Sequence, residues 1–360
     1  MTGKKRVLVM ISSLGGGGAE RVATRLSSCL AERGHEVFLM PFSKTEQPYP
    51  VSDRVHLVDY APYDLRDRKP QPWQFLRLAH TAVRMLPRIV GLRRREGIDT
   101  ILSMLLAPNI LNVLAGGACK KVLCERNNPS KKGALRFALS KWAYAHADTV
   151  VFQTQYVRSL FSARVQRHAT VIPNPVEVDC AAAPSEEQTK LIVSAGRLVN
   201  QKNHALLIRA FARFLETHPG YELRIYGKGP LRPDLEGLLG ELGIAESARI
   251  EHFSDNLHEC IANARMFVLS SNFEGMPNAL LEAMAMGIAC ITTDYPSARE
   301  VVTGDASGIV VPMNDVEALS WAMSCLADDD DLCEGLAMGA RKRAQDFSID
   351  AIVPQWEAVL

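Results

Sequence analysis

Apolar runs and amphipathic stretches alternate along the whole chain, and this alternation predicts strands and helices in turn. The apolar runs are short, as in strands buried on both faces of a parallel sheet, and the stretches between them have helical period. The expected strands are RVLVMIS, HEVFLMPF, VHLVDY, DTILSML, KVLCE and DTVVFQT, then KLIVSAGRL, YELRIYG, ARIEHF, ARMFVLS, ACITT and GIVVP. The order predicts two α/β domains, each with a doubly wound parallel sheet that helices cover on both faces.

The segment Val171–Asp179 is predicted to join the two domains. Prolines flank Asn174 on either side, and the following residues, AAAPSEEQ, have the composition of a loop. A chain of 360 residues is long enough to build a separate core on each side of this joint. We therefore place the first domain at residues 1–172 and the second at residues 173–347.

The two halves of the chain carry opposite charge, although the net charge of the whole is only +1. Residues 1–180 hold 27 Lys and Arg against 14 Asp and Glu, whereas residues 181–360 hold 14 against 26. Such an asymmetry indicates different partners for the two domains. An anionic surface, either membrane phosphate or nucleic acid, suits the first domain.

Cysteine spacing and hydropathy bear on the cellular compartment. The eight cysteines form no C-x-x-C pair and have no metal-type spacing to histidine, which predicts a reduced, cytosolic protein without a metal site. The start, KKRVLVMISSL, leads directly into GGGG without a cleavage site, so it predicts a first strand and not a signal peptide. No apolar run has the length of a bilayer span. The acidic run Asp328–Asp331 is expected to be a solvated turn.

Glu274 and Glu282 are the strongest candidates for chemistry. Glu274 follows the apolar run Met266–Ser270, at the carboxyl end of a strand, where parallel sheets bind ligands. A turn with glycine and proline comes next, and a helix is predicted from Asn278, so Glu282 lies about one turn inside it. Amides at the start of this helix form an anion site. The arrangement suits a sugar nucleotide, with carboxylates for its hydroxyls and amides for its diphosphate.

The sequence around these carboxylates, FEGMPNALLEAMA, resembles the signature of retaining glycosyltransferases of family 4. The resemblance covers nearly the whole chain and implies the GT-B fold, two Rossmann-like doubly wound domains facing across a cleft, with residues 348–360 returning to the first domain. It implies that Glu274 contacts hydroxyls of the donor sugar and that Glu282 contacts the ribose. The further donor contacts that it implies here are Gly275, Met276, Pro277 and Asn278.

Two more loops resemble phosphate-binding loops of the same family. LGGGGAER follows the first strand, and its glycines allow backbone amides to approach a diphosphate, with Gly17 and Gly18 as the expected contacts. SAGRLVNQKN places Arg197 at the end of a strand and Lys202 near the next helix start. Fixed cations at such a place stabilise the charge that develops on a departing diphosphate.

The loops expected near the nucleobase match the family less closely. YGKGPLRPDL matches a G-x-G-x-L turn except for Pro230, and it makes Gly227 an expected donor contact. ARIEHFSDNLHE lacks the glycine that family members usually carry after the phenylalanine. The expected contacts in this loop are His252, Phe253 and Ser254, and the identity of the base stays open.

Arg126, in the loop CERNNPS, stands where many family members carry a histidine near the donor sugar. Arginine is no base at neutral pH, but it can hold a phosphate or a hydroxyl group. A front-face retaining mechanism tolerates the loss of the histidine, because the departing phosphate can take the proton of the acceptor. Arg126 is therefore a candidate catalytic residue, and a loop arginine that faces solvent is the alternative.

The stretch Pro72–Glu96 predicts an amphipathic helix that Pro87 kinks or splits. A cationic stripe lies beside an apolar one, which suits an anionic membrane or the diphosphate of a polyprenyl-linked acceptor. The arginines of the stripe are Arg77, Arg84, Arg88 and Arg95. The side chains expected to extend it are Lys131, Lys132, Arg136, Lys141, Trp142 and Tyr144. A solvated face over a core helix is the alternative.

These features together predict a retaining transferase that moves a hexose or N-acetylhexosamine, such as GalNAc, from a nucleotide sugar with UDP as the expected nucleotide. The predicted acceptor is a polyprenyl-diphosphate-linked saccharide in bacterial glycan assembly, at the inner face of the plasma membrane. No metal, cofactor or nucleic acid is expected. The alternatives are a sugar-nucleotide epimerase of the same fold, a transferase with a soluble acceptor, and a nucleotide-sugar-binding protein without catalysis.

Overall fold

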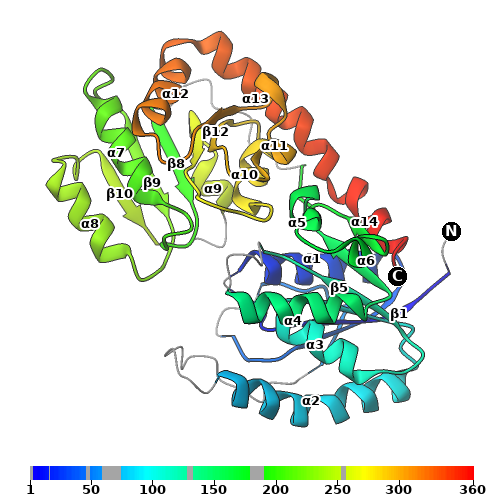
Figure 1. Cartoon of the computed structure of the whole chain (residues 1–360). Coiled ribbons are helices and arrows are strands. Elements are labelled where there is room, and N and C mark those ends of the chain that lie inside the picture. The colour runs from blue at the N-terminus through cyan, green and yellow to red at the C-terminus, as the bar shows by residue number, and fades with distance from the viewer. Residues whose placement is uncertain are drawn as a thin grey trace. The chain divides into compact units, whose positions relative to one another are not determined.

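The structure is a computed structural model that describes residues 3–15, 17–45, 49–58, 74–127, 133–178, 190–252 and 257–360. For residues 74–82, 257 and 305 it describes the backbone only. The chain forms two compact units (Figure 1). The N-terminal unit contains Met1–Asn174 and Ile352–Leu360, and the C-terminal unit contains Pro175–Ala351.

The N-terminal unit is built on a seven-stranded sheet in the order β3-β2-β1-β4-β5-β6-β7, in which all pairs of strands are parallel. Its strands are β1 (Arg6–Ile11), β2 (Glu36–Pro41), β3 (His56–Leu57), β4 (Thr100–Met104), β5 (Lys120–Cys124), β6 (Thr149–Phe152) and β7 (Ala169–Val171). The first six lie in the predicted apolar runs. The half-buried edge strand β7 has no such run and was missed.

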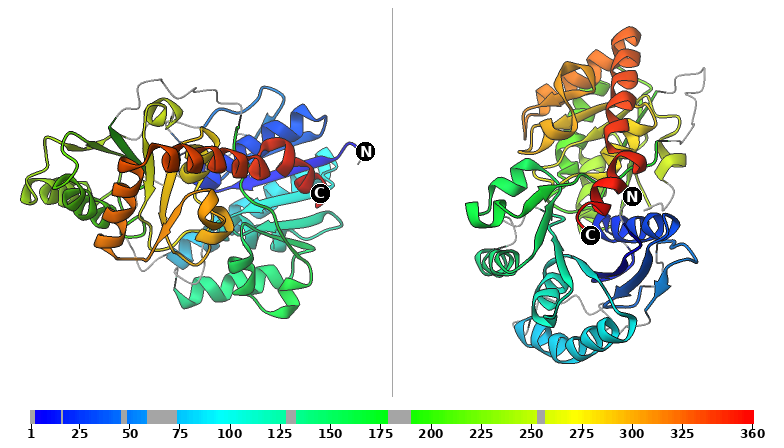
Figure 2. Two further views of the ribbon diagram at one scale, coloured as in Figure 1. Left: turned by 90° about the horizontal axis from the view of Figure 1, so that it is seen from above. Right: turned by 90° about the vertical axis from the view of Figure 1, so that its right-hand side faces the viewer.

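Helices cover both faces of this sheet, and α1 lies on the face opposite α2 (Figures 1 and 2). They are α1 (Gly18–Glu32), α2 (Gln74–Glu96), α3 (Leu106–Ala115), α4 (Ala134–Ala145), α5 (Gln155–Ser159) and α6 (Ala163–Gln166). Met85 and Ile89 of α2 are fully buried against Leu8 and Met10 of β1. Helix α2 runs through Pro87 as one element, so the expected split does not occur.

The C-terminal end of the chain completes the N-terminal unit. Helix α14 (Ile349–Glu357) buries Trp356 completely. The carboxylate of Glu357 accepts two hydrogen bonds of 3.0 Å from the guanidinium of Arg33 and one of 3.2 Å from Nε2 of His35. Nδ1 of His35 accepts the backbone N–H of Lys5, which fixes the proton on Nε2.

The C-terminal unit repeats this architecture with a six-stranded parallel sheet in the order β10-β9-β8-β11-β12-β13. Its strands are β8 (Leu191–Ala195), β9 (Glu222–Tyr226), β10 (Ala248–Glu251), β11 (Met266–Leu269), β12 (Ala289–Thr293) and β13 (Ile309–Val311). All six lie in predicted apolar runs. Each of β8, β11 and β12 is buried along its whole length, as expected for strands with helices on both sides.

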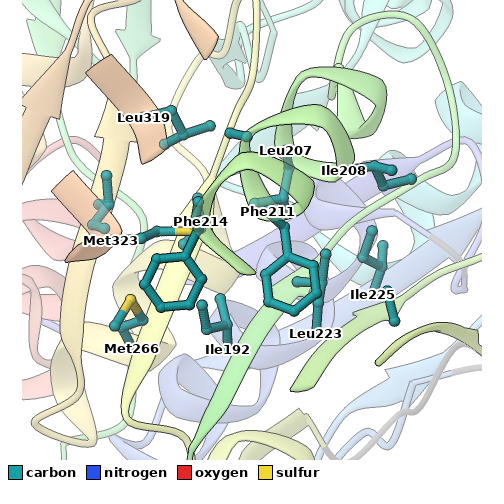
Figure 3. Close-up of a cluster of buried hydrophobic side chains, with 14 of the residues drawn as sticks. Ile192, Leu207, Ile208, Phe211, Phe214, Leu223, Ile225, Met266, Leu319 and Met323 are labelled. Atoms are coloured by element: carbon teal, nitrogen blue, oxygen red, sulfur yellow. The ribbon is translucent and has the colours of Figure 1, made fainter. Parts of the chain in front are cut away.

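Two hydrophobic clusters flank this second sheet. On one face, Phe211 and Phe214 of α7 point at the strands, where they meet Ile192 and Leu223 (Figure 3). On the other face, α10 and α13 contribute a second cluster that includes Leu280. The helices of the unit are α7 (His204–Leu215), α8 (Arg232–Glu241), α9 (Leu257–Ile261), α10 (Asn278–Ala285), α11 (Ala298–Val301), α12 (Val316–Asp328) and α13 (Asp330–Ala344).

The acidic run Asp328–Asp331 lies where α12 ends and α13 begins. The side chain of Asp329 accepts the backbone N–H of Leu332 over 2.9 Å and so caps α13. Asp330 lies 2.5 Å from the guanidinium of Arg265. The run is exposed as expected, but only Asp329 lies between the helices, and the carboxylates of the run stabilise the helix start.

Replacing Glu357 by Gln tests the attachment of α14. Hydrogen bonds from Arg33 are the main reason that the pKa of Glu357 lies below its ordinary value of 4.5. A lowered pKa in the folded state means that the carboxylate adds stability above about pH 4.5 and loses this contribution as the pH falls through the folded value. We expect E357Q to lower the free energy of unfolding at pH 7 by about 1 kcal/mol.

Urea unfolding at several pH values measures this effect. The difference between E357Q and the parent should shrink below pH 4.5. The control is E246Q, at an exposed position of the other unit. An equal loss of stability at all pH values would contradict the role of the ionised carboxylate.

Candidate functional site

In the sheet of the C-terminal unit, the order in which the chain adds strands reverses between β8 and β11. From β8 the chain adds β9 and β10 on one side, and then β11, β12 and β13 on the other. Open α/β sheets bind ligands at the carboxyl edge of such a switch point. Because β8 and β11 pair in parallel, the loop at residues 196–203 and the loop at residues 270–277 leave the sheet side by side.

Lys202 and Glu274 form an ion pair between these two loops. Nζ of Lys202 lies 2.7 Å from Oε1 of Glu274, and the hydroxyl of Ser271 donates to the same oxygen over 2.7 Å. The side-chain amide of Gln201 donates to the other carboxylate oxygen over 3.2 Å. Only 12% of the Lys202 side chain and 8% of the Glu274 side chain are exposed. At such burial, removing one partner leaves an uncompensated charge, so the pair resists rearrangement.

Further hydrogen bonds hold the backbones of the two loops together. The backbone N–H of Asn272 donates to the carbonyl of Gln201 over 2.8 Å, and its side-chain amide donates to the carbonyl of Asn200 over 2.9 Å. The hydroxyl of Ser270 lies 3.0 Å from the carbonyl oxygen of Lys202. Each loop thus fixes the position of the charged group on the other.

Arg197 is the exposed cation of this site. Its Nη2 donates to Oε1 of Gln201 over 3.3 Å, while the amide nitrogen of the same glutamine holds Glu274. Gln201 therefore links an exposed cation to a buried carboxylate. The two cations and one carboxylate give these side chains at the switch point a net positive charge, which suits an anionic ligand.

His204 lies behind these cations as the first residue of α7, with 3% of its surface exposed. Burial and, after it, the charge of Lys202 lower the pKa of His204 to about 4, although backbone groups of Arg197 and Gly196 act in the opposite direction. The imidazole is therefore neutral at physiological pH. The ring therefore fills space behind the loop of Lys202 without adding a charge.

Gly227 and Gly229 allow the loop after β9 to touch the loop after β8. A Cβ atom on Gly227 would lie 2.0 Å from the carbonyl oxygen of Gly196, and one on Gly229 would lie 2.4 Å from that of Leu198. The backbone N–H of Leu198 donates to the carbonyl of Lys228 over 3.1 Å. Gly227, expected as a donor contact, thus has a packing role that any side chain would disrupt.

The turn after Glu274 leads into α10, whose N-cap residue is Pro277. The hydroxyl of Ser297 donates to the carbonyl of Gly275 over 2.9 Å and holds the turn in place. Glu282 lies about one turn into the helix and is 2% exposed. The expected donor contacts in the turn are buried or half-buried: Gly275, Met276, Pro277 and Asn278.

The glycine loop of the N-terminal unit lies at the carboxyl end of β1, at the switch point between β1 and β4. Gly17 is the N-cap residue of α1 and Gly18 is its first residue. A Cβ atom on Gly17 would lie 2.2 Å from a carboxylate oxygen of Glu20. The amides of the first turn of α1 therefore lie at the edge where parallel sheets bind ligands.

Glu125 organises a second buried network in the N-terminal unit, after β5. Its Oε2 accepts the hydroxyl of Tyr144 over 2.9 Å, and its Oε1 accepts the backbone N–H groups of Arg126 and Asn127 over 3.0 and 3.1 Å. Burial and, after it, Glu125 raise the pKa of Tyr144 well above its ordinary value. The structure thus corrects the expectation that Tyr144 extends a surface patch.

Arg126 is buried in the same region, so the alternative of a loop arginine that faces solvent is wrong. Its Nη2 donates to the side-chain oxygen of Asn174. Burial lowers its pKa to about 10, against the effects of Cys124 and Glu125, and the guanidinium remains charged at neutral pH. A contact between Arg126 and a substrate stays a prediction.

The predicted cationic stripe lies on α2. Arg84 and Arg88 are exposed, and Arg95 is exposed beside Glu96, whose carboxylate is 2.6 Å away. The expected apolar stripe on this helix is buried at Met85, Ile89 and Leu92. The side chain of Arg77 lies outside the described residues, as do Phe253 and Ser254. His252 is exposed.

Two family models match the chain along most of its length. The model named Glycosyltransferase Family 4 matches residues 16–179, and the model named Glycosyl transferases group 1 matches residues 177–343. The chain is a glycosyltransferase that joins a family 4 domain to a group 1 domain. A relative in Campylobacter jejuni, N-acetylgalactosamine-N,N'-diacetylbacillosaminyl-diphospho-undecaprenol 4-alpha-N-acetylgalactosaminyltransferase, is 28% identical to this glycosyltransferase over 358 residues, 94% of each chain.

Solved structures confirm the GT-B fold of this glycosyltransferase. Sucrose-phosphate synthase from Thermosynechococcus elongatus has a TM-score of 0.82 at 18% identity, covering 99% of this chain and 98% of the other. Anabaena Alr3699/HepE, solved in complex with UDP and glucose, has a TM-score of 0.79 at 15% identity and covers 98% of both chains. The protein is a hexosyltransferase, and the transferase interpretation fits better than the epimerase alternative.

Several polar residues around the predicted side chains were missed. Gln201, Ser271 and Asn272 lie in the two loops of the switch point, directly beside Lys202 and Glu274. Their polar character next to the motif residues was the available signal. Asn109, whose amide donates to the carbonyl of Cys124 over 3.0 Å in the Glu125 network, has no comparable signal, because it lies inside an apolar helical stretch.

The contact between Gly227 and Gly196 predicts a large difference between two glycine substitutions. In G227A the added Cβ meets backbone, which must shift, and we expect the free energy of unfolding to fall by at least about 2 kcal/mol. In G237A, within α8, the Cβ meets nothing within 4 Å, and we expect a gain of about 0.5–1 kcal/mol. Urea unfolding of both variants measures the difference, and equal effects would contradict the role assigned to Gly227.

Proposed function

We propose that the protein is a retaining glycosyltransferase that moves a hexose or N-acetylhexosamine, such as GalNAc, from a UDP-sugar to a polyprenyl-diphosphate-linked saccharide in bacterial glycan assembly. The ion pair of Lys202 and Glu274, with Arg197 beside it, is the observation that carries this proposal. It lies at the switch point of the sheet, where ligands bind, and it presents both cations and a carboxylate.

The two cations stabilise the leaving group, which is the nucleoside diphosphate. When the bond between the anomeric carbon and the β-phosphate oxygen breaks, its electron pair stays on the diphosphate. Arg197 and Lys202 neutralise that charge, a role that a metal ion fills in other transferases, and so no metal is needed in this proposal. The acceptor hydroxyl attacks on the face that the phosphate leaves and gives its proton to the departing phosphate oxygen, which retains the anomeric configuration.

The carboxylates hold the donor. Glu274 is fixed by donors from Gln201, Ser271 and Lys202, so its remaining lone pair, on Oε2, has a defined direction for a sugar hydroxyl. Glu282 holds the ribose. The amides of Gly275, Met276 and Asn278 contact the diphosphate.

The names of the relatives support the proposed acceptor. The Campylobacter jejuni transferase, aligned along almost its whole length, has a name that specifies a saccharide on diphospho-undecaprenol as its acceptor. The UDP and glucose bound to Anabaena HepE support a UDP-sugar donor. With such an acceptor, we propose that the reaction takes place at the inner face of the plasma membrane.

The basic N-terminal unit supplies the membrane contact in this proposal, in preference to nucleic acid. Helix α4 exposes Leu135 and Trp142, seven positions apart on one helical face, with 55% and 40% of their surface accessible. Arg136 and Lys141 on the same helix are exposed, and the arginines of α2 add positive charge. Apolar side chains among cations suit an anionic lipid surface. No helix among the described residues has the length and apolar character of a bilayer span.

Transfer of label tests the proposed activity. The purified chain is incubated with a panel of radiolabelled sugar nucleotides and a bacterial lipid extract. We expect label to pass from one UDP-sugar into the lipid fraction, with the anomeric configuration retained. An altered donor without transfer indicates an epimerase, label in a water-soluble product indicates a soluble acceptor, and binding alone indicates a protein without catalysis.

Lys202→Gln tests the charge at the leaving group. Glutamine keeps a hydrogen-bond donor for Glu274 and removes the cation. We expect kcat to fall about a hundredfold to a thousandfold, because one preorganised donor at a developing oxyanion has an effect of this size. The matched control is K342Q, at an exposed position of α13. Parent-like turnover in K202Q would contradict the mechanism.

Trp142→Ser tests the membrane contact. Flotation with vesicles that contain phosphatidylglycerol should show severalfold weaker binding for W142S, and salt should weaken the binding of the parent chain. The matched control is W321S, which removes a tryptophan that is 65% exposed on α12 of the acidic unit. Equal binding by W142S and W321S would contradict the role of α4.

A further inference from the structure

The chain passes between its two units twice, at Asn174–Pro175 and at Ala351–Ile352. In the C-terminal unit the two passing segments lie against each other. The backbone N–H of Val176 donates to the carbonyl of Phe347 over 2.8 Å, and Val176 forms a parallel bridge with Ser348. The two crossings are therefore paired on that side.

On the side of the N-terminal unit, one guanidinium contacts both passing segments. Nη2 of Arg126 donates to Oδ1 of Asn174, the last residue before the first crossing. Cζ of Arg126 lies 5.9 Å from the ring centroid of Trp356, five residues after the second crossing. The amide of Gln153 donates to the same oxygen of Asn174 over 2.8 Å. Arg126 thus reaches from the loop after β5 to both segments.

The burial of these side chains makes the contact rigid. Arg126, Asn174 and Trp356 are 5%, 2% and 0% exposed. Among the described residues, Nη2 of Arg126 has an acceptor, whereas its Nε and Nη1 are buried without a hydrogen-bond partner. The amide oxygen of Asn174 and the ring of Trp356 therefore compensate for part of the hydration that the guanidinium loses. The planar guanidinium fits one arrangement of these partners. The flexible ammonium of a lysine would not hold the partners in the same arrangement.

We propose that Arg126 is a positioning residue that acts through the two passing segments. It fixes the path by which the chain leaves and re-enters the N-terminal unit, and transfer depends on how firmly these two segments are held. This inference rests on the proposed function. It differs from the expectation that Arg126 itself contacts the donor or the acceptor.

A double-substitution cycle in the full chain separates the two roles. We expect R126A and N174A each to lower kcat about tenfold, and the double variant to be no more than about twofold worse than R126A, because both remove the same contact. Donor affinity, measured by titration with UDP, should stay within about twofold of the parent value. R126K should recover only part of the loss, since lysine keeps the charge without the planar fork.

Hydrogen exchange supplies a readout that does not depend on activity. The amide of Val176 should exchange faster in R126A and N174A, and not in R164A, which removes an exposed arginine of the same unit. Circular dichroism and thermal unfolding confirm that the variants are folded. N174A is the milder change and keeps the cycle interpretable if R126A does not fold.

Other outcomes would overturn the proposal. If Arg126 contacts a substrate directly, R126A loses activity while N174A keeps it, and exchange at Val176 is unchanged. Loss of UDP affinity in R126A alone would have the same meaning. If the parent chain transfers no sugar at all, the proposed function fails, whereas the exchange measurement still decides whether Arg126 fixes the passing segments.

Discussion

The ion pair between Lys202 and Glu274 is the interaction on which the C-terminal site depends. Its members lie on loops after two different strands, and the parallel pairing of β8 with β11 brings those loops together. Hydrogen bonds from Asn272 set the distance between the backbones, and the ion pair then fixes where charge lies. The carboxylate and the ammonium are therefore oriented before any ligand arrives, which is the condition for electrostatic stabilisation of a transition state.

Residues around this ion pair stabilise its arrangement. Gly227 and Gly229 let the loop after β9 approach the loop after β8 more closely than side chains would allow, and Gly196 leaves room for the side chain of Lys202. His204 fills the space below the loop of Lys202 without adding a second buried charge, because its pKa is low. Gln201 uses both ends of its amide, one for Arg197 and one for Glu274. The site is thus a single hydrogen-bonded unit, although its members come from different strand ends.

Most of the fold was readable from the sequence because buried parallel strands are continuous apolar runs. All six such runs in the second half became strands, and the helix after Glu274 begins at the predicted Asn278. Strand β7 escaped prediction because its three residues are only half-buried at a sheet edge. The motif loops located Lys202 and Glu274, since strand ends at a switch point are where ligand-binding side chains gather.

The features that the sequence did not predict depend on contacts between residues far apart in the chain, which local sequence patterns do not encode. Arg126 meets Asn174 and Trp356, which are 48 and 230 positions away in the sequence. Tyr144 lies on a helix with several cations, and the sequence did not show that its hydroxyl turns inward to Glu125. Side chains that meet only after both sheets have formed leave no periodic signal. The amino-acid composition predicted that the two halves of the chain differ in net charge. It did not predict which charged side chains are exposed.

The discontinuity of the N-terminal unit has a consequence for biosynthesis. Its core includes Trp356, yet the 177 residues of the other unit, Pro175–Ala351, are translated between Asn174 and Ile352. Domains usually fold in the order in which they leave the ribosome. Here the unit made first is completed only when Ile352–Leu360 has been made. The surface that buries Trp356 stays uncovered while the second unit is translated, and a nascent chain halted before Ile352 would expose this surface to chaperones.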